Sequence, residues 1–407
     1  MHIFINQKNF KEERQEFVER KGKGHPDTLS DALAEELSIN YSNYTLKRFG
    51  AVLHHNFDKV GLLGGASHVV FGEGYLTAPI KILLNGRTST KFGDESIPVN
   101  DLLTRWTKEF FKGRLANLNV EKDLEFQYNL SHQSSPGKTY EKKSAKGTRR
   151  YWFEPRGLCD LQELKKLVSN DTSLGVGYAP RTPLENLVLA IEDKLSLQDY
   201  KKKNSWIGSD IKILGFRNKN EYFITSCIPQ ISTCVRNVKE YKNNLEVARK
   251  TIQGVAKKHK VSKLELSINT RDNFKTTELY LTATGSSIES GDEGLVGRGN
   301  RINGVISPSK PLSMEGVCGK NPVYHIGKVY YLAANEIAKK IYKKFKISNE
   351  VFLASQSGRD LLDPWLALVM TPVRFNRKKE LEAFINEEVK LIPTLTKSLL
   401  AKKHTLY

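Results

Sequence analysis

The chain has 407 residues, of which 39% are hydrophobic and 27% charged, and its formal net charge is +19. This length exceeds what one simple core holds, so we expect two or three sub-structures with enough apolar side chains to bury. No run of about eighteen apolar residues occurs, so no membrane span is expected. The positive charge favours polyanions as partners (nucleic acid, anionic membranes or phosphorylated small molecules) without choosing among them.

The N-terminus and the cysteines bear on the cellular compartment. Residues 1–17 become charged within a dozen positions and lack the apolar core of a secretory signal. The four cysteines, Cys159, Cys227, Cys234 and Cys318, are widely spaced and form no C-x-x-C pair. We therefore expect reduced thiols and a cytoplasmic protein.

The first distinctive segment covers residues 19–38, ERKGKGHPDTLSDALAEELS. Its glycines and proline predict a turn, and we expect Asp27 to cap the helix that follows. Leucines and acids each recur every four residues, so Asp27, Asp31 and Glu35 should share a helix face that points away from the core. This column is either the acidic first turns of an ordinary amphipathic helix or a Mg²⁺ site with His25 beside it.

Strand and helix patterns follow up to about residue 115. The polar sequence LHHNFDK runs into a short buried strand at 60–63, and its adjacent residues His54 and His55 point to opposite faces. Further patterns predict strands at 68–71 and 79–84 and a helix at 99–115.

Residues 134–156 form a strongly basic stretch that ends in the aromatic residues Tyr151, Trp152 and Phe153. Basic residues beside aromatic rings suit single-stranded nucleic acid. The alternative is an exposed, partly disordered loop that ends in a strand. We interpret the stretch as a basic loop insertion.

The rest of the chain alternates strand pairs with helices. Helices are predicted at 182–197, 238–258 and about 329–346, and one or two closing helices at 377–400, within a C-terminal helical segment 375–407. Strands are predicted at 210–216, 222–228, 264–269, 279–284 and 351–359, with Asp210 and Lys212 on one face. This alternation predicts an α+β fold of interwoven sub-structures.

A glycine-rich stretch, residues 285–308, follows directly on one of these strands and carries Asp292, Glu293, Arg298 and Arg301. Glycine lets the backbone approach a ligand closely, and arginine offers a fork of donors that suits phosphate oxygens. The stretch therefore reads as an oligophosphate cradle, although it matches no nucleotide fingerprint. Taken alone, a mobile surface loop is the alternative.

Six motifs occur in a fixed order along the chain: RKGKGHPDTLSD, LHHNFDKVGLLGG, NDTSLGVGYAP, GSDIK, TGSSIESGDEGLVGRGNRINGVISP and GKNPVYHIGK. Together they resemble the archaeal-type S-adenosylmethionine synthetase (methionine adenosyltransferase) family, from about residue 19 to 372. The resemblance implies three interwoven sub-structures over residues 1–407 without clean linear boundaries. It also implies a homodimer with active sites at the subunit interface, a Mg²⁺ requirement and activation by K⁺.

The implied reaction joins ATP and L-methionine. The methionine sulfur attacks the ribose C5′ and displaces triphosphate, which is then cleaved to pyrophosphate and phosphate. A neutral thioether needs no general base, so catalysis must come from orientation and from stabilising charge on the departing triphosphate. Lysine, arginine, histidine and Mg²⁺ suit that task.

The resemblance also implies residue roles. His25 contacts the triphosphate at the breaking bond, and Arg298 grips it during cleavage. Asp27 binds Mg²⁺, with Asp31 as its neighbour. The other assigned residues contact phosphate or hold ATP and methionine: Lys212, Lys320, Asp171, Asp210, Asp292, Gly294, Arg301 and Asn321.

Two residues depart from the family patterns. Tyr324 stands where the family has asparagine, beside His325, and Thr28 stands where the bacterial and eukaryotic branch has lysine. Two other functions stay open. One is a paralogue of the same fold that takes a different thioether. The other is a basic nucleic-acid-binding protein, which the dispersed charge and the lack of a module signature disfavour.

Overall fold

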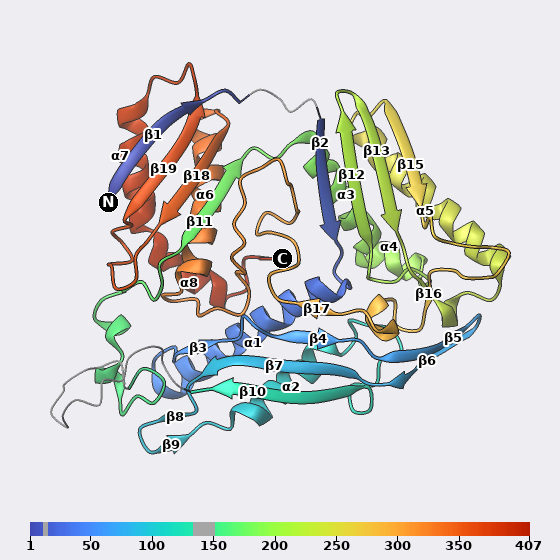
Figure 1. The fold of residues 1–407 in the computed structure, drawn as a ribbon, viewed down its shortest axis with the longest axis horizontal. Coiled ribbons are helices and arrows are strands. Elements are labelled where there is room, and N and C mark those ends of the chain that lie inside the picture. Colours follow the sequence, from blue (N-terminus) through green and yellow to red (C-terminus); the bar gives the residue numbers. More distant parts are fainter. Residues whose placement is uncertain (11–14, 133–150) are drawn as a thin grey trace.

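The computed structural model describes residues 1–10, 15–132 and 151–407. Most of the predicted basic loop, residues 133–150, lies outside this range. Three larger sheets surround a central segment that contains the glycine-rich stretch (Figure 1). Each sheet combines strands from distant parts of the chain, so the fold brings residues far apart in sequence to one centre.

The first sheet contains both the first and the last strand of the chain. Its strands, in spatial order, are β1 (His2–Lys8), β19 (Leu366–Pro372), β18 (Asn349–Ala354) and β11 (Leu174–Ala179). Helix α6 (Ile326–Phe345) packs on β11 and β18, and α7 (Lys378–Lys390) packs on the same core. A Cβ on Gly177 would lie 2.4 Å from the carbonyl oxygen of Ala334, so glycine is what allows β11 to lie against α6.

The second sheet lies under the long helix α1 (Pro26–Phe49). Its strands are β10 (Leu124–Ser131), β7 (Ile80–Thr88), β4 (Gly61–Leu63) and β17 (Gly294–Leu295), with β3 (His55–Asn56) also paired to β7. The leucine stripe of α1 packs with α2 (Val99–Phe111) in one core, where Leu33 and Leu37 are fully buried. The predicted apolar face of this helix is therefore confirmed.

The third sheet carries helices on one face. Its strands are β15 (Lys263–Ile268), β13 (Glu221–Cys227), β12 (Lys212–Asn218) and β2 (Gln15–Lys21). Helices α3 (Pro183–Ser196), α4 (Gln198–Lys203) and α5 (Val238–Lys258) complete this unit. Along β2 the residues alternate, with Val18 buried under the helices and Phe17 exposed on the opposite face.

Shorter elements lie outside the three large sheets. They are the ladders β5 (Ala66–Val70) with β6 (Glu73–Ala78), β8 (Lys91–Phe92) with β9 (Glu95–Ser96) and β14 (Gln230–Ile231) with β16 (Leu281–Thr282), and the C-terminal helix α8 (Ile392–Leu400). None of the helices that the structure describes is long and apolar enough to cross a bilayer. All four cysteines are free.

The α+β fold class is confirmed, with local corrections. The strand expected at 210–216 begins only at Lys212, so Asp210 lies in the segment before β12. The helix expected from about residue 329 begins at Ile326. The closing segment forms two helices, α7 and α8, which agrees with the one or two that were expected. The N-terminal strands β1 and β2 had no predicted counterpart, because their pairing partners lie hundreds of residues away.

Candidate active site

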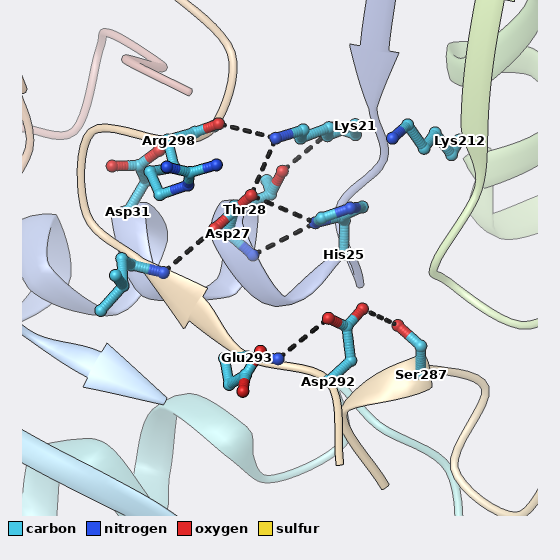
Figure 2. A network of polar contacts seen from close by, with 12 residues as sticks. Lys21, His25, Asp27, Thr28, Asp31, Lys212, Ser287, Asp292, Glu293 and Arg298 are labelled. Atoms are coloured by element: carbon cyan, nitrogen blue, oxygen red, sulfur yellow. Dashed lines mark hydrogen bonds and ion pairs between the residues drawn. The ribbon is translucent and has the colours of Figure 1, made fainter. Parts of the chain in front are cut away.

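A glycine turn places the start of α1 against the beginning of β12. A Cβ on Gly22 would lie 2.5 Å from the carbonyl oxygen of Ile211, and one on Gly24 would lie 2.1 Å from the Ser209 hydroxyl. Only glycine lets the two backbones approach this closely. As a result, the charges of Asp210 and Lys212 act on His25 at the end of the turn, and Figure 2 shows His25 with Lys212.

His25, not Asp27, is the N-cap of α1. Its backbone is extended, and its Nδ1 accepts a hydrogen bond of 3.2 Å from the backbone N–H of Asp27. The prediction that Asp27 caps the helix is wrong, because Pro26 already occupies the first helical position, where its missing N–H costs nothing. The carboxylate of Asp27 is thereby released from capping and points toward the glycine-rich stretch.

The acidic column of α1 is buried, which contradicts the expectation that it faces away from the core. Asp27 accepts a hydrogen bond of 2.8 Å from the Lys21 ammonium (Figure 2) and one of 3.0 Å from the backbone N–H of Leu295. Asp31 accepts one of 2.8 Å from the backbone N–H of Gly297. Burial raises the pKa of Asp31 to about 7. The glycine-rich stretch covers this helix face, which helical periodicity alone does not reveal.

The glycine-rich stretch is anchored at several points. A Cβ on Gly294 would lie 2.0 Å from the carbonyl oxygen of Pro26. The side chain of Asn300 bonds both the N–H and the carbonyl of Lys21. Arg301 donates to the carbonyl oxygens of Gly297 and Gly299 at 2.5 and 2.9 Å. These contacts favour a fixed cradle over a mobile surface loop.

Cationic side chains border this cradle. The carbonyl of Arg298 accepts from Lys21 at 2.8 Å, while its guanidinium is exposed and forms no hydrogen bond or ion pair with the described residues (Figure 2). Lys212 lies 3.3 Å from the carboxylate of Glu19 and is half-exposed. The cradle therefore offers an arginine whose donors are free for an anion.

Asp210 and Asp292 meet through Ser287. The Ser287 hydroxyl bonds Asp210 at 2.6 Å and Asp292 at 2.9 Å, and the Tyr280 hydroxyl donates to Asp210 at 3.2 Å. Burial raises the pKa of Asp210. Burial lowers the pKa of the His25 imidazole, against the opposing pull of Asp210, so His25 is neutral at neutral pH. We call the residues around the glycine turn and cradle the His25 cluster: Lys21, His25, Asp27, Asp210, Lys212, Asp292 and Arg298.

A second group of predicted site residues lines a cavity of about 660 Å³, which we call the Lys320 cavity. Lys320 is 3% exposed, contacts the carboxylate of Glu315, and lies 3.8 Å from Asp58. Burial lowers the pKa of Lys320 to about 8, with Asp58 opposing the shift. Lys59 pairs with Asp58 at 2.6 Å, and the exposed Asp171 also lines the cavity.

Helix α1 also positions Lys320. The N–H of Gly319 donates to Glu35 at 3.0 Å, and Glu35 forms a buried ion pair of 2.7 Å with Lys328 of α6. Asn321 is fully buried, and its amide oxygen accepts from the N–H of Val323 at 2.9 Å. Glu35 and Asn321 therefore hold the turn on which Lys320 stands.

Sequence reasoning missed some of these residues. Lys21 and Arg87 carry cationic side chains into the two groups, and Glu315 contacts Lys320. Glu35 was predicted only as part of the acidic column, not as the residue that bonds Gly319 next to Lys320. The glycines around Lys21 hinted at its place. Arg87 stands at the end of β7, where a Cβ on Gly86 would lie 2.1 Å from the carbonyl of Asn56, and that crowding is visible only in three dimensions.

The predicted site residues thus fall into two groups within one chain. The His25 cluster, with Asp31, Gly294 and Arg301, lies around the cradle, while Asp171, Lys320 and Asn321 lie at the cavity. The residues whose charges shift the pKa of His25 are not the ones whose charges shift the pKa of Lys320. In the described ranges, no three histidine, cysteine or carboxylate side chains converge on a metal position.

Comparison with known proteins shows which family this chain resembles. The family model described as S-adenosylmethionine synthetase (AdoMet synthetase) matches residues 3–148 and 154–403. An S-adenosylmethionine synthase of Saccharolobus islandicus is 37% identical, covering 96% of this chain and 95% of the relative. One of Hyperthermus butylicus is 34% identical, covering 97% and 96%.

A solved structure supports the fold independently. An unusual S-adenosylmethionine synthetase from Campylobacter jejuni aligns with a TM-score of 0.58 at 14% identity, covering 95% of this chain and 93% of that one. The chain belongs to the S-adenosylmethionine synthetase family. It is a transferase that forms S-adenosylmethionine, as predicted from the six motifs. The family uses divalent metal ions, and its substrates are ATP and methionine.

Proposed function

We propose that S-adenosylmethionine forms from ATP and L-methionine where the His25 cluster of one subunit faces the Lys320 cavity of another. The free guanidinium of Arg298 is the observation that carries this proposal: it stands on an anchored cradle whose backbone is joined to Lys21 and Asp27, the neighbours of the neutral His25. A triphosphate leaving group needs many donors and cations around it. The two groups together supply Lys21, Lys212, Lys320 and Arg298, which neither group does alone.

In this arrangement His25 lies at the bridging oxygen between C5′ and the triphosphate. Its Nδ1 accepts from the N–H of Asp27, so the proton of the neutral imidazole is on Nε2, from which it can donate to that oxygen. The sulfur lone pair forms the S–C5′ bond while the C5′–O bond breaks and its electrons leave with the triphosphate. Asp210 and Asp292, joined through Ser287, are placed to hold polar groups of the substrates.

Asp27 is the proposed Mg²⁺ ligand. Mg²⁺ is usually bound by one or two carboxylates together with substrate phosphates and waters, so a single carboxylate beside a phosphate cradle fits it. Both Asp27 and Asp31 accept a hydrogen bond from the cradle backbone, but the second oxygen of Asp27 contacts the Lys21 ammonium, a partner that a metal can displace. When bound, Mg²⁺ would neutralise triphosphate charge. We also propose K⁺ activation, as the family resemblance implies.

We propose a homodimer with both active sites between the subunits. Each of the three sheets has large apolar residues exposed on the face that its helices do not cover, among them Phe4, Phe17, Leu63, Leu214 and Leu295. Apolar sheet faces of this kind typify protein interfaces. Leu295 adjoins Asp27, so the exposed face runs up to the His25 cluster. A cytoplasmic location is proposed with it, supported by the four free cysteines.

The reaction is tested by incubating the chain with labelled methionine, ATP and Mg²⁺, with and without K⁺ at constant ionic strength. We expect S-adenosylmethionine, pyrophosphate and phosphate in equal amounts. A His25→Ala variant should form none of them, while Lys339→Ala, an exposed change on α6, should match the unaltered chain. Failure to form S-adenosylmethionine at any Mg²⁺ or K⁺ concentration would contradict the proposal.

A further inference from the structure

A smaller pocket of about 110 Å³ opens beside the Lys320 cavity. We call it the aromatic annex, because the rings of His54, Trp152, Phe153 and Tyr324 line it. It shares lining residues with the Lys320 cavity, including Arg87 and His325, so the two spaces adjoin. No role described so far uses the annex.

The rings of the annex gather around His54. Trp152 stacks on His54 with centroids 5.4 Å apart and an interplanar angle of 16°, while Tyr324 and Phe153 lie at 4.8 and 5.7 Å. The Tyr324 hydroxyl contacts His54 Nδ1. Aromatic faces carry partial negative charge and attract cations, most strongly when water is excluded.

A carboxylate that does not itself line the annex lies next to His54. The Glu163 side chain is only 9% exposed and lies 3.4 Å from His54 Nε2, with no lysine or arginine of the described residues paired to it. A buried carboxylate without a cation is costly. The buried atoms Glu163 Oε1, His54 Nε2, Trp152 Nε1 and Asn56 Oδ1 all lack hydrogen-bond partners. Aromatic rings, a buried carboxylate whose only ionic partner among the described residues is His54, and a free amide oxygen together suit a mostly apolar cation.

We propose that the aromatic annex binds the sulfonium centre that forms during the reaction. This inference rests on the proposed function. As the sulfur lone pair makes the bond to C5′ and the C5′–O electron pair departs with triphosphate, sulfur gains one unit of positive charge and no proton moves. The annex stabilises that charge, while Lys320 and Lys59 of the adjoining cavity, together with Arg87, which lines both spaces, face the anion.

The size of the annex agrees with this assignment. Water occupies about 30 Å³ in the liquid, so the annex holds roughly three or four groups of that size. That is room for the sulfur with its methyl group and a neighbouring methylene, but not for a nucleoside. The amino-acid and adenosyl parts of the product would therefore extend into the larger cavity.

Calorimetry with two ligands tests the proposal. S-Adenosylmethionine carries the sulfonium, and S-adenosylhomocysteine is the neutral thioether that lacks its methyl group. We expect the unaltered chain to bind the sulfonium more tightly, and Trp152→Leu to lower that preference by about three- to tenfold. Trp152→Phe should restore most of it, because a ring is kept. Trp365→Leu, at a partly exposed tryptophan outside the annex, is the matched control and should not change the preference.

A second variant tests whether the charge of Glu163, and not its size, contributes to sulfonium binding. Glu163→Gln keeps the size of the side chain and removes its charge, so it should weaken sulfonium binding by about three- to tenfold and leave thioether binding nearly unchanged. Circular dichroism and thermal midpoints would establish that these variants fold.

Two results would overturn the inference. In one, Trp152→Leu and Glu163→Gln weaken both ligands equally, which would make the annex an ordinary apolar wall. In the other, K⁺ competes with S-adenosylmethionine when it replaces Na⁺ at constant ionic strength, and Trp152→Leu abolishes that competition, which would make the annex a metal-cation site. If the chain forms S-adenosylmethionine but the annex variants keep the full preference for the sulfonium over the thioether, only the annex assignment fails. If it forms none, the proposed function fails.

Discussion

The two arginines of the glycine-rich stretch differ in what their side chains contact. Arg301 bonds the carbonyl oxygens of Gly297, Gly299 and Ser313, so its donors are occupied in holding the cradle. The guanidinium of Arg298 has no such partner among the described residues. One arginine therefore shapes the loop, and the other is available to a ligand, a distinction that the sequence spacing does not show.

Replacing Arg298 should separate the two chemical steps. We expect Arg298→Ala to slow triphosphate cleavage by about a hundredfold and adenosyl transfer by less than about tenfold, because the guanidinium acts on the triphosphate after it has left. Single-turnover measurement of S-adenosylmethionine and phosphate tests this. Arg374→Ala, at an exposed arginine elsewhere, is the control. Equal loss of both steps would reject this division of labour.

His55 predicts a pH dependence of stability. Burial lowers the pKa of His55 to about 3, below its ordinary value of 6.5, so the unfolded chain binds a proton more readily than the folded one. Stability from the neutral imidazole is fully present above pH 6.5 and is lost as the pH falls from 6.5 toward 3, by up to about 1.4 kcal/mol per pH unit.

The His55→Gln variant measures this contribution. It should be less stable at pH 7, because the imidazole bonds Ser38 and the carbonyl of Leu53, yet lose less stability between pH 6.5 and 4.5 than the unaltered chain. Urea unfolding at several pH values tests this, with His2→Gln on the surface as the control. Parallel pH profiles for the two proteins would contradict it.

At the scale of elements, helix α1 and the glycine-rich stretch depend on each other. The cradle backbone donates to Asp27 and Asp31 near the start of α1, and Glu35 further along the helix holds the turn of Lys320. One helix therefore supports both groups of site residues. A displacement of either end of α1 would therefore shift residues in both the His25 cluster and the Lys320 cavity.

Glycine at position 294 is required by this packing. A methyl group there would meet the carbonyl oxygen of Pro26, so Gly294→Ala should push the cradle from α1 and lower both activity and thermal midpoint. Gly254→Ala in helix α5 is the matched control, because nothing lies within 4 Å of its Cβ position. That change should stabilise by about 0.5–1 kcal/mol. An active, equally stable Gly294→Ala protein would refute the packing argument.

Local patterns of sequence predicted many elements well and their partners poorly. The helix at 238–258 and the leucine stripe of α1 follow from periodicity, because each pattern is complete within one segment. The burial of Asp31 could not be predicted, because the chain that covers it lies more than 260 residues away. The pairing of β1 with β19 has the same cause.

At the scale of the molecule, the division of the site is the main consequence of the fold. The motifs predicted which residues act together, but not that the His25 cluster and the Lys320 cavity are separate groups within one chain. The uncovered apolar sheet faces give a physical reason for a second subunit to join them. The treatment of residues 1–407 as one interleaved unit without linear boundaries stays a prediction.

Mixing two inactive variants tests the shared site most directly. We expect the His25→Ala and Lys320→Ala chains to be inactive when each is assayed alone. The two variants are then co-expressed, or dissociated and remixed, to form mixed dimers. If each site takes His25 from one subunit and Lys320 from the other, a mixed dimer keeps one intact site, and activity should return to about a quarter of that of the unaltered enzyme. If both residues act within one chain, no mixed dimer has an intact site, and a mixture that stays inactive although mixed dimers form would contradict the account.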